Sequence, residues 1–235
     1  MASKTTKLSM HEQLMLLALR DEKGTLESRA GMHGYALGGA ILAELVLAGR
    51  ITLDDDKKQL VNIVDSSQMG EPFLDEAIEQ LASAKRRRRA SDWVMRFASI
   101  KKLRHRVAQQ LCRRGILKDA EDKVLWIFSR KIYPEIDARP EEQLVEELRE
   151  AIYDDHQKVP PRTAIVLSLA HATGMLGIHF DKRDLKRRKT RIEQIASGEA
   201  VGGATKVAVE AVQAALMAVQ TAATVAMITT TVATN

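Results

Sequence analysis

The residues of this chain that are best suited to chemistry are its clustered cations. Lys and Arg gather in three stretches, at residues 85–89, 101–114 and 182–191. Ammonium and guanidinium groups bind phosphate, and arginine adds a planar fork that can hold two oxygens at once. The whole chain carries 36 Lys and Arg against 31 Asp and Glu, a formal net charge of +5. These features predict an anionic partner.

The middle cluster is the strongest candidate. In "IKKLRHRVAQQLCRRG", Lys101, Arg104 and His105 are three and four residues apart, so we expect them on one edge of a helix. The segment that follows, "ILKDAEDKVLWIF", predicts a strand, a charged turn and a second strand. For a single cluster of this kind, a solvated helix face is the more ordinary interpretation. The aromatic hairpin beside it is what favours a binding surface.

The apolar end of this hairpin is a five-residue run that includes one of only two tryptophans in the chain; it comprises Val124, Leu125, Trp126, Ile127 and Phe128. A strand with one face inward buries about half of such a run. The other half packs on the protein's own core or contacts a membrane, where a tryptophan ring can be half wet. The residues alone leave both alternatives open.

Catalytic and metal-binding patterns are not apparent. The six histidines are scattered without a recognised ligand spacing, and Cys112 is the single cysteine, which rules out an internal disulfide or a Cys-based zinc cluster. "GYALGGA" matches neither the dinucleotide-binding nor the P-loop pattern, and close helix packing explains its glycines better. We therefore expect no enzyme, no metal and no cofactor.

Helical periodicity dominates the elements that must position these residues. We expect a mainly α fold: a single compact helical domain with small β-hairpins. Ser9 is the predicted start of a first helix that stops at Gly24, Pro72 opens another, and Ser91 and Asp92 are candidate caps of a third. Further helices are predicted at residues 35–50, 100–115, 139–155, 160–176 and 181–197, and a hairpin at 50–65.

The two ends of the chain differ in character. Residues 1–7 predict a short flexible N-terminus without the apolar core of a signal peptide, so a reducing compartment is expected. Residues 205–232 predict a buried core helix. The uncharged run from Ala211 is long enough to span a bilayer, but it contains Gln213 and Gln220 and lacks basic or aromatic anchors at its end. A membrane span stays open as the alternative.

Several stretches together resemble the Golgi phosphoprotein 3-like family of peripheral Golgi proteins that bind phosphatidylinositol 4-phosphate. They occur in family order over about residues 8–196, and they are "LSMHEQLMLLALRDEKG", "YALGGAILAELVLAGRITLD", "FLDEAIEQL", "LRHRVAQQLCRRGIL", "VLWIFSRKIYP" and "LSLAHATGML". The resemblance implies one helical lipid-binding domain over residues 8–235. It also implies a divergent member, for which a bacterial source is one alternative.

The resemblance carries over head-group residues position by position. Lys101 and Arg104 fall where two family arginines lie, the first as Lys in place of Arg. Arg29 falls at a family tryptophan and Gly38 at a third arginine, so two of four positions differ in kind. The resemblance therefore implies that Arg29, Lys101 and Arg104 bind an anionic lipid head group, with phosphatidylinositol 4-phosphate as the family's ligand.

The resemblance also implies partners and a location. The family hairpin for membrane contact and self-association matches Val124–Pro134, so we expect an anionic membrane surface and a homo-oligomer formed through the hairpin. The residues before the match show no Arg-rich segment for coat protein. The expected location is the cytosolic face of a membrane, the Golgi in a eukaryote or the inner membrane in a bacterium. A winged-helix-like module that binds nucleic acid is the alternative, because helix, glycine and hairpin also occur in that order there.

Overall fold

The computed structural model describes residues 7–20, 25–26, 32–54, 58–124, 128–156 and 158–201. Within these ranges the chain is mainly helical with three two-stranded antiparallel sheets, which confirms the predicted fold class. The helices are α1 (Met10–Ala18), α2 (His33–Leu47), α3 (Pro72–Ala82), α4 (Ala90–Ala98), α5 (Leu103–Arg113), α6 (Arg139–Tyr153), α7 (Pro161–Ala172), α8 (Leu176–His179), α9 (Lys182–Arg187) and α10 (Lys189–Ser197). The strands are β1 (Leu19–Arg20), β2 (Thr25–Leu26), β3 (Ile51–Leu53), β4 (Val61–Ile63), β5 (Ala120–Val124) and β6 (Phe128–Ile132). The helix predicted at 205–232 lies outside the described residues, as do residues 1–6.

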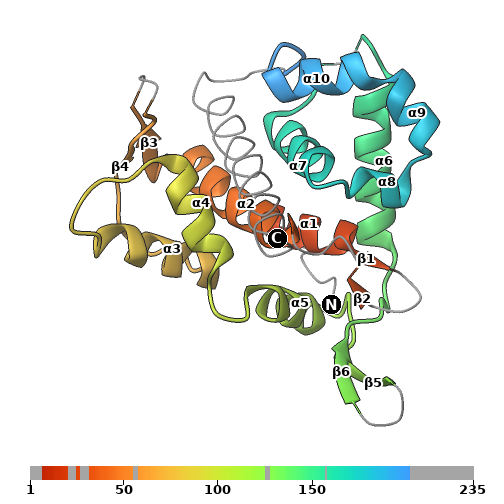
Figure 1. Cartoon of the computed structure of the whole chain (residues 1–235), viewed down its shortest axis with the longest axis horizontal. Helices are drawn as coiled ribbons and strands as arrows, with labels where there is room; N and C mark the ends of the chain where they lie inside the picture. Colours follow the sequence, from red (N-terminus) through yellow and green to blue (C-terminus); the bar gives the residue numbers. More distant parts are fainter. Residues whose placement is uncertain are drawn as a thin grey trace, which may run out of the picture.

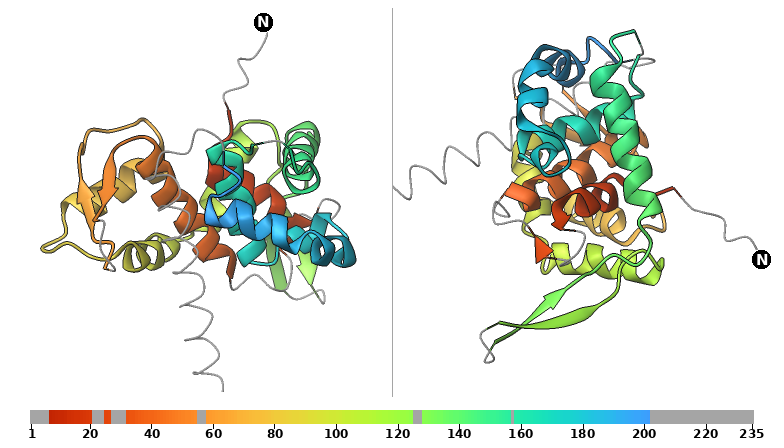
Figure 2. Two further views of the ribbon diagram at one scale, coloured as in Figure 1. Left: turned by 90° about the horizontal axis from the view of Figure 1, so that it is seen from above. Right: turned by 90° about the vertical axis from the view of Figure 1, so that its right-hand side faces the viewer.

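Helices α1 and α2 lie in the middle of the molecule (Figure 1). On one side lie α3, α4 and the β3–β4 hairpin, and on the other lie α6 to α10. Leu37, Ile41 and Leu45 of α2 are fully buried, because this helix is apolar around most of its circumference. Helix α5 lies at one end of the molecule, and the β5–β6 hairpin extends from that end away from the helices (Figure 2).

The start of α1 follows its sequence signal. Ser9 caps the helix: the Glu12 backbone N–H donates to Ser9 Oγ, and the Glu12 carboxylate accepts from the Ser9 backbone N–H. The predicted end at Gly24 is wrong. The helix stops at Ala18, because Leu19 becomes extended and pairs with Leu26 in the β1–β2 sheet.

Helix α3 begins at Pro72 as predicted, and Glu71 caps it by accepting from the backbone N–H groups of Phe73 and Leu74. Helix α4 begins earlier than predicted. Its cap position is Arg89, so Ser91 and Asp92 lie inside the first turn and cap nothing. The reason is a long-range contact, since the chain at Arg89 bridges to the strand region at Leu60 just before it turns into the helix.

The second hairpin differs from its prediction in where it turns. The charged stretch expected as the turn forms strand β5, and Val124 pairs with Phe128 at the closed end. The strands therefore pair as far as Val124 and Phe128, and residues 125–127 between these paired ends lie outside the described residues. These strands extend from the body of the protein and are held together by backbone hydrogen bonds between them. Charged residues are therefore compatible with a strand here.

Helices α2 and α4 cross closely at Gly38, as expected from the glycine-rich stretch. A Cβ added to Gly38 would lie 2.4 Å from the carbonyl oxygen of Val94 and 2.8 Å from the nitrogen of Ala98. A Cβ added to Gly34, one turn earlier, would lie 3.7 Å from the nearest atom, the carbonyl oxygen of Ala98. The crossing therefore requires glycine at position 38 and tolerates alanine at position 34.

This difference predicts opposite effects of two equal substitutions. Gly38→Ala should lower the free energy of unfolding by about 2 kcal/mol, because the new methyl group forces the helices apart. Gly34→Ala should leave it unchanged or raise it by up to about 1 kcal/mol through higher helix propensity. Urea unfolding of both variants measures this. Equal stability of the two variants would contradict the proposed crossing.

Candidate functional site

Helix α5 has three sides with different chemistry. Its inner side carries the apolar side chains of Leu103, Val107 and Leu111, four residues apart and buried in the core. This periodicity fixes how the helix is rotated about its axis. It follows that the charged residues of the same stretch divide between two flanks.

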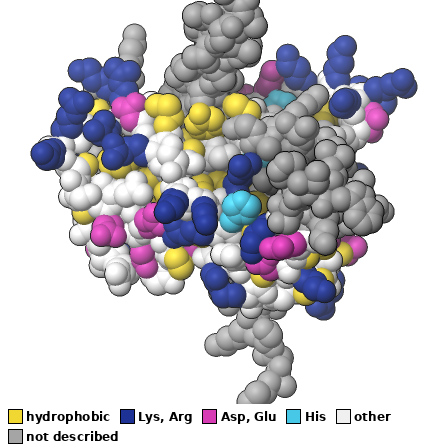
Figure 3. Space-filling view, turned by 60° about the horizontal axis from the view of Figure 1, so that its bottom comes forward, with side chains coloured by type: hydrophobic (Ala, Val, Ile, Leu, Met, Phe, Trp, Pro, Cys, Tyr) yellow, Lys and Arg dark blue, Asp and Glu magenta, His cyan; other side chains and the backbone are white. Residues whose placement is uncertain are grey.

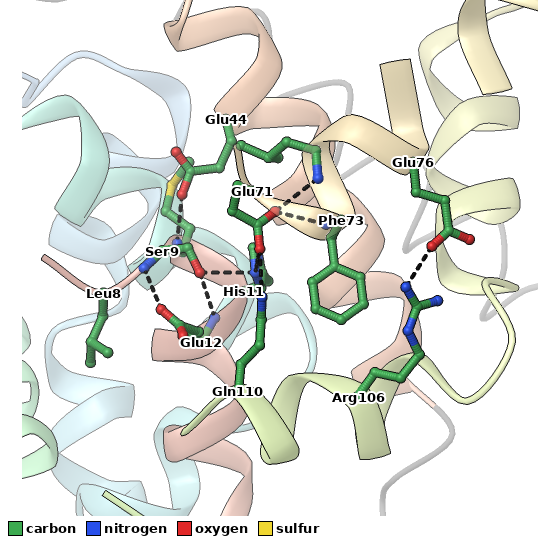
Figure 4. A network of polar contacts seen from close by, with 12 residues as sticks. Leu8, Ser9, His11, Glu12, Glu44, Glu71, Phe73, Glu76, Arg106 and Gln110 are labelled. Carbon is green, nitrogen blue, oxygen red and sulfur yellow. Dashed lines mark hydrogen bonds and ion pairs between the residues drawn. The ribbon is translucent and has the colours of Figure 1, made fainter. Parts of the chain in front are cut away.

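The first flank of α5 is tied to acids of α1 and α3. Three side chains at four-residue spacing each find a carboxylate, and Figure 4 shows two of these contacts. The pairs are Arg106 Nη2 with Glu76 Oε2 at 2.7 Å, Gln110 Nε2 with Glu71 Oε1 at 2.8 Å, and Arg114 Nη1 with Glu12 Oε2 at 2.6 Å. These polar groups hold α5 against the body of the protein.

Glu71 is the centre of this polar network. Burial alone would raise the pKa of Glu71, but hydrogen bonds from His11, Gln110 and the backbone N–H of Leu74 outweigh burial and hold that pKa below its ordinary value. Nε2 of the fully buried His11 lies 3.4 Å from Glu71 Oε1 and 2.9 Å from Ser9 Oγ (Figure 4). The carboxylate therefore stays ionised and keeps its partners.

The outer flank carries Lys101, Lys102 and Arg104, and all three are exposed. Among the residues that the structure describes, no acid lies within ion-pair distance of any of them. The prediction that Lys101 lies on the helix is wrong: Lys101 and Lys102 form the turn before α5. Lys102 has a left-handed backbone with φ 55°, which costs about 1 kcal/mol for a residue other than glycine.

His105 connects this flank to the hairpin. Its Nδ1 lies 3.0 Å from the hydroxyl oxygen of Tyr133, a buried residue just after β6. Two residues before Tyr133, Lys131 of β6 pairs with Asp119 at 3.2 Å. The basic turn, His105 and the base of the hairpin are therefore parts of one surface.

The positive charge of this surface affects His105. Burial lowers the pKa of His105, and the neighbouring Arg104, Lys102 and Lys131 lower it further, while Asp119 opposes them. The imidazole thus resists protonation, because burial and the neighbouring cations both disfavour its charged form. A bound anion would offset the part of the shift that the cations cause.

Comparison with known proteins identifies the family to which the chain belongs. The family model described as Golgi phosphoprotein 3 matches residues 10–219, which is most of the chain. The chain belongs to the Golgi phosphoprotein 3 family. The vacuolar protein sorting-associated protein 74 of Eremothecium gossypii is 31% identical over 155 residues, which cover 58% of this chain. The chain thus matches less than half, 46%, of that relative's length.

The four head-group positions implied by the family resemblance lie in different parts of the structure, and one of them is not described. Lys101 is exposed in the turn before α5 and Arg104 is exposed on the first turn of the helix, and their head-group role stays a prediction. Gly38, at the position of a family arginine, lies in the α2–α4 crossing, where no side chain fits. Arg29 lies outside the described residues, as do Leu125, Trp126 and Ile127. Their roles stay predictions.

Lys102, Lys131 and Tyr133 also contribute to this surface, and pattern reasoning did not select them. Lys131 and Tyr133 reach α5 only through the register of the hairpin, in which Ala120 pairs with Ile132. The only sequence signal was the position of a lysine and a tyrosine directly after the apolar run.

Two further observations concern the described residues of this family member. None of their helices combines the length and the apolar character needed to cross a bilayer. No three of their His, Cys, Asp or Glu side chains gather where they could hold a metal ion.

The charges around His105 predict opposite shifts of its pKa in two variants. Lys102→Ala removes a repelling cation and should raise the pKa of His105 toward the ordinary value of about 6.5. Asp119→Asn removes the stabilising acid and should lower this pKa. NMR titration of the His105 ring measures both. Shifts of the same sign, or no shift in either variant, would contradict the described arrangement.

Proposed function

We propose that this protein is a peripheral membrane protein that binds anionic phospholipid through the outer flank of α5 and the adjacent β5–β6 hairpin, without catalysing a reaction. The observation that carries this proposal is the set of three exposed cations, without acid partners among the described residues, near the base of a projecting hairpin. Membership in the Golgi phosphoprotein 3 family supports a role at a membrane.

The expected strength is that of reversible binding. Each Lys or Arg near an anionic membrane surface contributes about 1 kcal/mol, so three give roughly 3 kcal/mol. An apolar hairpin end that enters the interface adds to this by burial of its side chains. The sum favours a protein that can leave the membrane again.

Phosphatidylinositol 4-phosphate is the proposed head group, because the family resemblance places Lys101 and Arg104 at head-group positions. Its phosphomonoester carries more charge than the diester of an ordinary anionic lipid, which suits several cations within one turn. Lys101 lacks the planar fork of an arginine, and Gly38 offers no side chain. We therefore expect weaker preference among head groups than four basic or aromatic ligands would give.

The proposed location is the cytosolic face of a membrane, the Golgi in a eukaryotic cell, and self-association through the hairpin is proposed with it. A nucleic acid is the competing partner for the same cations. Helix α5 offers duplex DNA phosphate contacts, but its base-reading groups are few. Gln110 is already held by Glu71, which leaves Gln109 as the amide available for a base edge.

Removal of the two family-position cations is the direct test. Lys101→Ala with Arg104→Ala should lower affinity for vesicles that contain phosphatidylinositol 4-phosphate at least tenfold and abolish the preference over phosphatidylserine vesicles, because roughly 2 kcal/mol of attraction is lost. Both residues are exposed, so folding should be unaffected. Vesicle cosedimentation measures this.

The matched control removes the same charge elsewhere. Lys182→Ala with Arg183→Ala changes two exposed cations of α9 and should retain the head-group preference. The site on α5 is refuted if its double variant and the α9 variant bind alike. A double variant that loses duplex DNA but still binds vesicles would assign the surface to nucleic acid.

Trp126→Ala tests the hairpin separately. We expect this variant to keep its head-group preference but to bind less tightly at high salt, where apolar insertion rather than charge holds the protein on the vesicle. Cosedimentation over a salt series measures the difference. Unchanged binding at high salt would contradict insertion of the hairpin end.

A further inference from the structure

A second cationic surface lies at the other end of α4. The segment 85–89, "KRRRR", connects α3 to α4, and Lys85, Arg86, Arg87 and Arg89 are exposed. Two backbone hydrogen bonds fix this segment beside β4: the Val61 N–H donates to the Arg88 carbonyl at 2.9 Å, and the Ala90 N–H donates to the Gln59 carbonyl at 3.0 Å. The cations thus stand on an ordered backbone.

One cation of the segment is neutralised within the protein. Arg87 Nη1 lies 3.0 Å from Asp54 Oδ2 and donates to Asn62 Oδ1 at 2.7 Å. The other four, Lys85, Arg86, Arg88 and Arg89, have no acid within ion-pair distance in the part of the chain that the structure describes. Segments 50–65 and 85–89 together contain eight Lys and Arg but only four Asp, so positive charge remains in excess however these residues pair.

Exposed aliphatic side chains accompany this charge. Ile63, the last residue of β4, is 41% exposed, and Val64 after it is 61% exposed. They directly follow Asn62, the residue that holds Arg87. Exposed branched apolar side chains on the segment whose Asn62 holds Arg87, together with cations that have no acid partner in the described residues, suit the interface of an anionic bilayer, which offers acyl chains next to phosphates. A nucleic acid phosphate backbone would use the cations and leave the aliphatic groups in water.

The two cationic surfaces are connected by α4. Arg89 occupies the cap position of this helix, and Lys101 follows its last residue by three positions. Nine helical residues separate the two groups by roughly 14 Å along the axis. Arg96, exposed on α4 between them, lies over the ring of Trp93 at 5.4 Å. Figure 3 shows Lys and Arg side chains in several groups on one face, one of them at the end that carries β3 and β4.

We propose that Lys85, Arg86, Arg88 and Arg89, together with Ile63 and Val64, form a second contact with the same anionic bilayer. The bilayer as partner rests on the proposed function of the α5 surface. The second contact requires only negatively charged lipid, not a particular head group. Two contacts on one rigid body bind more tightly than either alone and fix the orientation of the protein on the membrane.

The test removes the second surface and leaves the first intact. Lys85→Ser, Arg86→Ser and Arg89→Ser in one variant remove three exposed cations and retain Arg87, which Asp54 and Asn62 hold. Vesicles of phosphatidylcholine with phosphatidylserine, without phosphoinositide, are the probe. Each cation at the membrane surface contributes up to roughly a fivefold factor to the affinity for the vesicle. At low salt the variant should therefore bind these vesicles about tenfold or more weakly than wild type. Val64→Ser should weaken binding mainly at high salt.

The control is a triple variant with the same charge change on α9, Lys182→Ser with Arg183→Ser and Lys186→Ser. It should bind close to wild type. Equal losses in the two triple variants would overturn the second contact, because net charge alone would then explain both. Loss of duplex DNA binding with unchanged vesicle binding would overturn it as well, by assigning the segment to nucleic acid.

A phosphoinositide arm separates this proposal from the first. On vesicles that also contain phosphatidylinositol 4-phosphate, the 85–89 variant should still prefer the phosphoinositide, because Lys101 and Arg104 are intact. Failure of the α5 site would appear as unchanged preference in the Lys101→Ala and Arg104→Ala variant. A failure of one proposal can therefore be distinguished from a failure of the other, because each is measured on a different variant.

Discussion

The division of charge on α5 is the constraint from which the rest of the account follows. Buried or half-buried carboxylates of α1 and α3 need cationic or amide partners, since a buried charge without a partner is costly. One flank of α5 supplies them through Arg106, Gln110 and Arg114. These carboxylates are thereby paired with one flank of α5, while Asp119, near His105, pairs with Lys131. Lys101, Lys102 and Arg104 on the other side remain without acids in the described structure, and we propose this surface as the anion site.

The hairpin adds a second kind of chemistry at the same place. His105 and Tyr133 connect the basic flank to the base of the hairpin, and the strand register pairs Val124 with Phe128 at the far end of the described strands. Cations at the base and apolar residues at the end correspond to the order of phosphates and acyl chains in a bilayer. The second contact that we propose would combine the cations of 85–89 with the exposed Ile63 and Val64 in the same way, on a smaller scale.

Local signals predicted much of the fold. Ser9 and Pro72 mark helix starts because their effects act within one turn, and the glycine-rich stretch indicated a close helix crossing that Gly38 makes with α4. The predictions that were wrong concerned features that depend on contacts between segments distant in the sequence. The start of α4 depends on the bridge from Arg89 to Leu60, and the turn of the second hairpin depends on strand pairing outside the core. The site was partly predictable for the same reason: the cations are adjacent in sequence, whereas Tyr133 reaches them only through the fold.

We propose that the outer flank of α5 and the hairpin end face one membrane at the same time. Spin labels at Ser99, beside the basic turn, at Ile127 and at Ser197 of α10 measure this in a Cys112→Ala background by their accessibility to oxygen and to a water-soluble relaxation agent on anionic vesicles. We predict that the Ile127 label enters the acyl region, the Ser99 label lies at the level of the head groups, and the Ser197 label stays in water. Labels at Ile127 and Ser197 that are equally accessible from water on bound protein would contradict the account.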